Sequence, residues 1–178
     1  MNRTYHIIVN LAICVVQILL NNYLNISQYV LVSLLPLVVM SLPLKRSTNF
    51  ALFVAFFAGM AVDLLSSSQL GCTSICLLVC ALLKNTVFKL VYGDEIFSYR
   101  DGCPLTYQSS RETGIAISIL CAIYFLLYVL IDSAGTLPLN VNLLRWVISS
   151  AISALLCFIC TSVLYKGEKH YERFESLY

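Results

Sequence analysis

The sequence predicts an all-α, polytopic membrane protein with six transmembrane helices. Hydrophobic residues make up 60% of the 178 residues and charged residues only 11%, whereas a soluble domain has roughly 45–50% apolar and about 25% charged residues. The apolar residues also fall into long continuous runs, close to the roughly 20 residues that a helix needs to cross the hydrocarbon core. A helix pairs its backbone groups within its own segment, so a helical bundle is the structure that these runs favour.

Six apolar runs carry this prediction. They extend from Tyr5 to Leu20, Ile26 to Leu44, Phe50 to Leu65, Leu70 to Val91, Ile115 to Ile131 and Val141 to Tyr165. The third run has Asp63 near its end, and the fourth has Lys84 and Lys89 on its last turns. We expect Pro36 to kink the second helix and Pro43 to help end it, because proline lacks the N–H that an interior helical position donates.

The connections between the runs indicate one membrane domain over residues 1–178. Short connections join the first four runs, which makes consecutive helices antiparallel neighbours. One link is long, from Tyr92 to Gly114, and its charged residues place it in water or at the lipid headgroups. A charged tail, residues 166–178, follows the last run.

The distribution of Lys and Arg predicts the orientation, because cytoplasmic loops carry an excess of basic residues. With the N-terminus inside, ten of the eleven basic residues are expected on the cytoplasmic side: Arg3, Lys45, Arg46, Lys84, Lys89, Arg100, Arg111, Lys166, Lys169 and Arg173. Only Arg145 is then outside. This bias favours an even number of crossings, both termini in the cytoplasm, and a cytoplasmic basic turn at Lys45 and Arg46.

Three charged residues are expected near the outer ends of different helices: Asp63, Asp132 and Arg145. A charge near the bilayer is costly unless it has a partner, so each is a candidate functional or structural residue. We expect Arg145 to form a buried or interfacial ion pair with one of the two aspartates. A ligand or another membrane protein is the alternative partner.

The cysteines favour packing over chemistry. Cys72, Cys76 and Cys80 lie four residues apart, on one face of the fourth helix, with no His nearby to complete a metal site. We therefore expect a packing stripe and no bound metal. Cys157 and Cys160 have the CxxC spacing of thiol oxidoreductases, which leaves a redox enzyme as an alternative hypothesis.

Small and polar residues recur along two of the predicted helices. Ser149, Ser153, Cys157 and Thr161 repeat every four residues on the sixth helix. Asn10 and Gln17 share one face of the first helix. In lipid such residues let helices approach closely and form hydrogen bonds between them, so we expect both sets to face neighbouring helices. No pair of side chains has the pattern of a catalytic dyad, so an enzyme is not expected.

A short motif joins the third and fourth helices. Gly59 is followed by Asp63 and a pair of leucines, then by a Ser-rich turn and Gly71. In this motif, in length and in helix layout, the chain resembles the MreD family of rod shape-determining membrane proteins. Many members of that family carry a His just after the second Gly, where this chain has Cys72 and Thr73. Physically, Gly59 would permit a close helix crossing, Asp63 would accept hydrogen bonds from amides that begin the fourth helix, and Gly71 would supply a turn conformation.

The resemblance implies a non-enzymatic scaffold of the bacterial elongasome, in the inner membrane, with no cofactor. Members of the family pair with the single-span protein MreC and link MreB filaments to the wall synthases PBP2 and RodA, which would be the partners here. The family is similar in fold to the substrate-binding subunits of energy-coupling-factor vitamin transporters. A vitamin-binding subunit is therefore the main alternative function, with a pocket that Tyr124, Tyr128, Asn142 and Trp146 could line.

Overall fold

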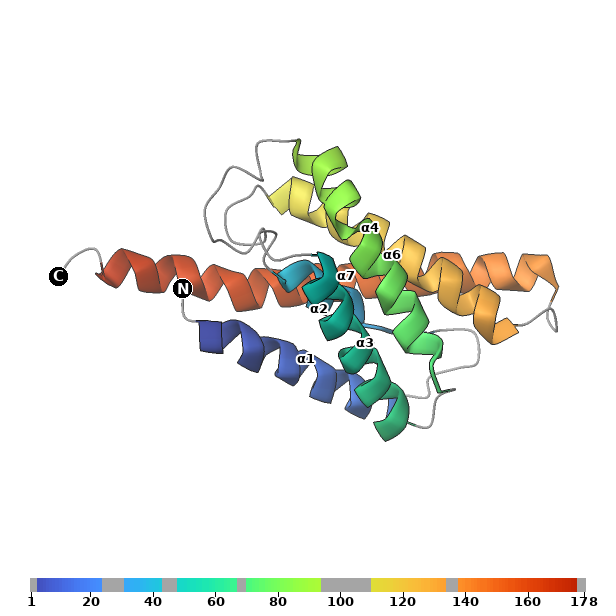
Figure 1. The fold of residues 1–178 in the computed structure, drawn as a ribbon. Coiled ribbons are helices and arrows are strands. Elements are labelled where there is room, and N and C mark those ends of the chain that lie inside the picture. The colour runs from blue at the N-terminus through green and yellow to red at the C-terminus, as the bar shows by residue number, and fades with distance from the viewer. Residues whose placement is uncertain are drawn as a thin grey trace.

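The described part of the chain is all-helical and consists of six helices. The computed structural model describes residues 3–23, 31–42, 48–66, 70–93, 110–133 and 138–175. Its helices are α1 (Arg3–Tyr23), α2 (Leu35–Ser41), α3 (Thr48–Leu65), α4 (Cys72–Tyr92), α6 (Ser110–Ser133) and α7 (Leu139–Glu175). The first turn of α1 and the last turns of α7 lie at the same end of the molecule (Figure 1).

Four of these helices are long and apolar enough to cross a membrane: α3, α4, the Arg111–Ser133 part of α6 and the Leu139–Val163 part of α7. The apolar part of α1, Ile7–Tyr23, is shorter. The prediction of membrane helices is therefore supported for these four segments, whereas the count of six crossings stays a prediction.

The second predicted span, Ile26–Leu44, agrees least with its prediction, which was one helix kinked at Pro36. Residues 31–34 are not helical, and the helix that follows them, α2, has only 7 residues. Pro36 lies in the first turn of α2. It cannot donate to the carbonyl of Val32, and its ring would press against that carbonyl in a continuous helix, so α2 begins next to the proline, in a first turn where its missing N–H has no helical acceptor.

Helix α2 lies at the centre of the bundle (Figure 1) and packs against all five other helices. All of its residues are buried. The apolar core forms around it, with large contributions from Leu35, Leu37, Phe88, Leu120 and Phe125. A short helix can be accommodated here because its ends are covered by protein instead of lipid.

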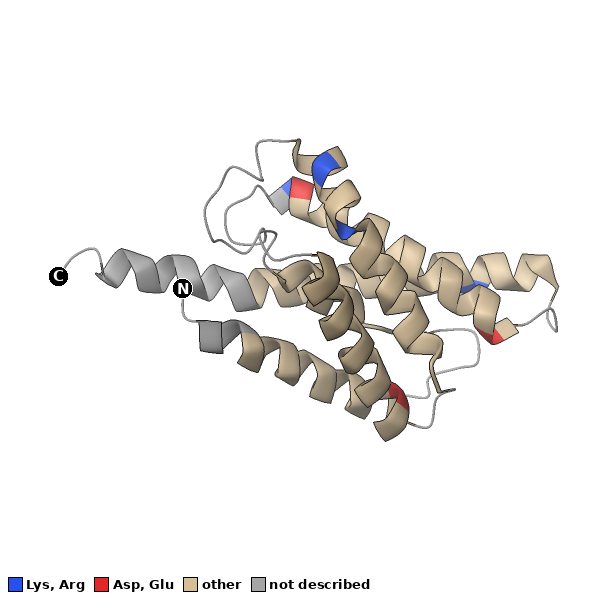
Figure 2. Ribbon diagram, viewed as in Figure 1, with Lys and Arg blue, Asp and Glu red and all other residues tan. Residues whose placement is uncertain are grey.

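The charged residues that are coloured on the ribbon lie toward the two ends of the bundle and leave its middle nearly bare (Figure 2). The structure also moves two predicted boundaries. Helix α6 begins at Ser110, so the end of the predicted Tyr92–Gly114 link is helical, and α7 continues to Glu175, through most of the predicted tail. Lys45 and Arg46 lie outside the described residues.

Candidate functional site

The three motif residues Gly59, Asp63 and Gly71 come together where α3 packs against α4. Small residues line this face of α3, with Ala51, Ala55 and Gly59 buried at intervals of four. A Cβ atom added to Gly59 would lie 2.6 Å from the Ser74 Cα and 2.9 Å from its amide nitrogen. The two backbones therefore cross in contact, and only glycine fits at this position of α3.

Asp63 is buried one turn further along α3, with 1% of its surface exposed. Its Oδ2 atom accepts hydrogen bonds from the Gly71 amide at 2.9 Å and from the Ser74 amide and hydroxyl, both at 3.4 Å. These donors belong to the N-terminal end of α4, where free N–H groups and the helix dipole favour a negative charge. The carboxylate thus stabilises the start of α4 and fastens it to α3.

Gly71 precedes α4 with φ +88°, in the left-handed region that favours glycine. Its carbonyl accepts the first helical bond of α4, from the Ile75 amide at 3.0 Å. We call Gly59, Asp63, Gly71 and Ser74 the α3–α4 clasp. The clasp can hold two helices at a fixed distance and angle, and it presents a carboxylate whose Oδ1 atom has no hydrogen-bond partner among the described residues.

The other two predicted charges form an ion pair at the same end of the bundle, where α6 ends and α7 begins. An Nη2 of Arg145 lies 2.9 Å from Oδ2 of Asp132. Arg145 is 6% exposed, and its Nε has no hydrogen-bond partner within the described ranges. Of the three charges that the sequence groups together, Asp132 and Arg145 therefore pair with each other, and Asp63 instead binds the amides of α4.

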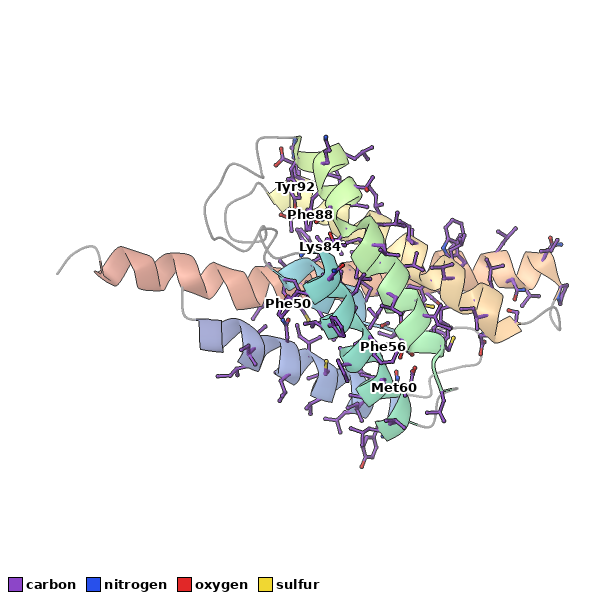
Figure 3. The ribbon with its side chains drawn as sticks, viewed as in Figure 1. Phe50, Phe56, Met60, Lys84, Phe88 and Tyr92 are labelled. Atoms are coloured by element: carbon purple, nitrogen blue, oxygen red, sulfur yellow. The ribbon has the colours of Figure 1, made fainter. Side chains whose placement is uncertain are left out.

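Lys84 is buried inside the bundle, a feature that the sequence patterns above do not predict. It is 2% exposed, and its ammonium donates to the carbonyl of Leu42, at the end of α2. Its expected place toward the cytoplasmic side of the membrane stays a prediction. The ammonium also lies 5.7 Å from the centre of the Phe88 ring, and Figure 3 shows the two side chains close together on α4. A cation at the C-terminal end of a helix is stabilised by the free carbonyls there.

The sequence did contain an indication of this burial. The spacing of four that defines the Cys72, Cys76 and Cys80 stripe continues to Lys84 and Phe88, and all five side chains are buried. A basic residue that continues a buried stripe is expected to share its environment.

The polar residues of α1 and α7 bond to the backbone of residues 31–34. Oε1 of Gln17 accepts from the Leu34 amide at 2.8 Å, and its Nε2 donates to the Val32 carbonyl at 3.1 Å. On the other side, the hydroxyls of Ser149 and Ser153 accept from the amides of Leu31 and Ser33, each at 3.0 Å. Gln17, Ser149 and Ser153 thus bond across to a neighbour as expected, but the neighbour is non-helical backbone. Thr161 instead donates to the Cys157 carbonyl within α7.

The residues of the two alternative sites, the CxxC pair and the proposed vitamin pocket, form contacts within the chain. Cys157 is buried, and its thiol lies 3.8 Å from the Ser33 carbonyl, whereas Cys160 is half-buried, and both thiols are free. Of the residues proposed for a vitamin pocket, Tyr124 is 2% exposed and stacks on Tyr128. Trp146 donates to the Ala122 carbonyl, and Asn142 accepts from the Ser133 hydroxyl.

The described residues contain no group of three or more His, Cys, Asp and Glu side chains placed to hold a metal ion. Comparison with known proteins gives no match to any protein-family model, curated protein or solved structure.

Proposed function

We propose that this chain is a non-enzymatic membrane scaffold of the bacterial cell-elongation machinery, with the role in peptidoglycan synthesis that the MreD family has as the partner of MreC. The α3–α4 clasp is the observation that carries the proposal. The residues on which the resemblance rests, Gly59, Asp63 and Gly71, converge in one set of contacts that holds two helices together. A motif with this geometry supplies rigidity, which a scaffold needs in order to present fixed surfaces to several partners.

The polar groups inside the bundle also favour a scaffold. Asp63, Lys84 and Gln17 are charged or polar side chains that a membrane enzyme or channel could expose to a substrate. Each of them bonds to backbone groups of the chain itself. Their hydrogen bonds fix the positions of α2, α3 and α4 relative to one another.

The proposed location is the bacterial inner membrane, with both termini in the cytoplasm. Four long apolar helices support a membrane location. The first turn of α1 and the last turns of α7 share one end of the bundle, as an even number of crossings requires (Figure 1). Single-span MreC is the expected partner within the membrane, and MreB filaments, PBP2 and RodA are the expected wider contacts.

Depletion of the protein in its native host tests the proposal. Rod shape should be lost, and it should be restored by the wild-type chain and by Gly114→Ala, a helix variant whose new Cβ would meet only the Phe158 side chain at 3.5 Å. Gly59→Ala should restore shape poorly at an equal membrane level, and should retain less MreC on copurification. Unchanged cell outline and wall incorporation after depletion would refute the proposal.

A vitamin-binding subunit of an energy-coupling-factor transporter is the second candidate. The observation in its favour is the break at residues 31–34, because discontinuous helices form the substrate sites of many transporters. A thermal-shift screen of the purified protein with vitamins tests it. A ligand at 100 times its Kd should stabilise the folded state by about 2.7 kcal/mol, and no shift with any vitamin would exclude this function.

A further inference from the structure

An open groove runs along the outer surface of the bundle between α3 and α4. It has a volume of about 300 Å³ and is lined by Asn49, Leu52, Phe53 and Phe56 of α3 and by Leu78 of α4. Phe53 is 65% exposed and Phe56 is 39% exposed, so the groove faces outward. Both helices are long and apolar enough to cross a membrane, so this α3–α4 groove opens toward lipid.

The groove belongs to the half of α3 that begins at Thr48. From Asn49 to Phe56 the helix rises about 10 Å, whereas the whole of α3, with 18 residues, is about 27 Å long. Asn85 of α4 donates to Thr48, so the last turns of α4 lie beside the first turn of α3. Since each leaflet contributes about 15 Å of hydrocarbon, the groove lies within one leaflet, at the end of the bundle where α3 starts and α4 ends.

The size of the groove favours a narrow occupant. A helix has a diameter of about 10 Å, so a length of 10 Å occupies roughly 800 Å³ and cannot enter a groove of about 300 Å³. An acyl chain is a single file of methylene groups and is much narrower. The groove is apolar along its length, and Asn49 adds one exposed amide in the first turn of α3, where it can donate to a phosphate or ester oxygen.

The sequence around this end of the groove is basic. Residues 1–62 contain Arg3, Lys45 and Arg46 but no Asp or Glu. Lys45 and Arg46 lie outside the described residues, but they precede Asn49 by four and three positions, so their Cα atoms lie within about 15 Å of its Cα. Asp63 is the first acidic residue, and it lies about 21 Å further along α3. An anionic group beside Asn49 would therefore have two cations near it.

We propose that the α3–α4 groove binds one anionic phospholipid, with an acyl chain in the groove and its phosphate beside Lys45, Arg46 and Asn49. The apolar lining selects the chain, and the basic residues select an anionic headgroup over a zwitterionic one. The site goes beyond the proposed function and requires only that α3 and α4 lie in a membrane.

Quenching of tryptophan fluorescence by brominated phospholipids tests the site in nanodiscs that mix phosphatidylglycerol with phosphatidylcholine. The reporter is Phe53→Trp in a chain that also carries Trp146→Phe. The matched reporter is Leu155→Trp in the same background, at a 64% exposed position of α7. The quantity measured is the ratio of the association constants of the two lipids. We expect a ratio of about 30 at Phe53→Trp, roughly 5-fold for each basic residue, and a ratio near one at Leu155→Trp.

Two pairs of variants, each made with the Phe53→Trp reporter, separate the headgroup from the acyl chain. Lys45→Gln/Arg46→Gln should lower the ratio to near one, whereas Lys45→Arg/Arg46→Lys keeps both charges and should keep the ratio. Leu78→Phe narrows the groove and should weaken phosphatidylglycerol binding severalfold. Leu82→Phe is the matched control, because Leu82 is an exposed residue of α4 outside the groove.

Equal ratios at the two reporters would overturn the proposal. So would a Leu78→Phe variant that binds phosphatidylglycerol as the parent chain does, because the lipid would then be held by its headgroup without the groove. Native mass spectrometry of the unsubstituted chain gives a second measurement that needs no variant. The folded protein released from the same nanodiscs should retain one phosphatidylglycerol, and retention of phosphatidylcholine in its place, or of no lipid, would also contradict the proposal.

Discussion

Replacement of Gly59 by alanine is the sharpest test of the clasp. The added Cβ would lie 2.6 Å from the Ser74 Cα, whereas ordinary contacts begin at 3.4 Å, so α3 and α4 must separate locally by about 0.8 Å. The nearest clashing atoms belong to backbone, so no side-chain rotation relieves the contact. The separation also lengthens the Asp63 bonds to Ser74, which are already 3.4 Å long.

The expected cost follows from two opposed effects. Overpacking of a tight contact costs roughly 1–3 kcal/mol, and the higher helix propensity of alanine returns up to about 1 kcal/mol. We therefore expect Gly59→Ala to lower the free energy of unfolding by about 1–2 kcal/mol, which raises the unfolded fraction roughly 5- to 30-fold.

Reversible unfolding in mixed micelles measures this change, and Gly114→Ala is the matched control. Gly114 is also helical, but its added Cβ would make only an ordinary contact with the Phe158 ring. This control should be neutral or slightly stabilising, because alanine is favoured over glycine within a helix. If Gly59→Ala were as stable as Gly114→Ala, the close crossing of α3 and α4 would not exist as described.

Three further substitutions test the other contacts by the same unfolding assay. Gly71→Ala has free space for its Cβ but requires φ +88°, so it should cost about 1 kcal/mol of stability through backbone strain alone. An unchanged unfolding midpoint would contradict the left-handed turn. Asp132→Asn should cost about 1–3 kcal/mol of stability because it leaves the buried Arg145 guanidinium without its anion. The double variant with Arg145→Gln should cost less than the sum of the two single variants. Strict additivity of the two costs would show that the pair does not interact. Lys84→Met should cost about 1–3 kcal/mol of stability because it removes a hydrogen-bond donor to the end of α2. Lys89→Met, at an exposed position, should change stability less. Equal effects of the two substitutions would argue against a buried Lys84.

Local patterns in the sequence were sufficient for the long helices α1, α3, α4, α6 and α7 and for the clasp. A run such as Ile115–Ile131 is apolar on every side, so any helix it forms must be covered by lipid or protein. Gly59, Asp63 and Gly71 lie within 13 residues of one chain segment, so a turn between two helices brings them together. The contacts expected of them could be stated because helix geometry fixes which residues face each other over such short separations.

The partner of Lys84 shows what pattern alone leaves undecided. A lysine in the last turns of an apolar run can reach the headgroups or remain buried, and the run itself is the same in both cases. The choice depends on whether a carbonyl is available at the right depth. That carbonyl belongs to Leu42, which lies 42 positions earlier in the chain.

The composition and the spacing of apolar residues by themselves determined that this chain forms long helices suited to lipid, with small and polar residues facing inward. Only the tertiary structure decided that the second apolar run ends as a seven-residue helix at the centre of the bundle. The reason is physical: Pro36 weakens a continuous helix, but the break is stable only because Gln17, Ser149 and Ser153 reach its backbone from helices far away in sequence.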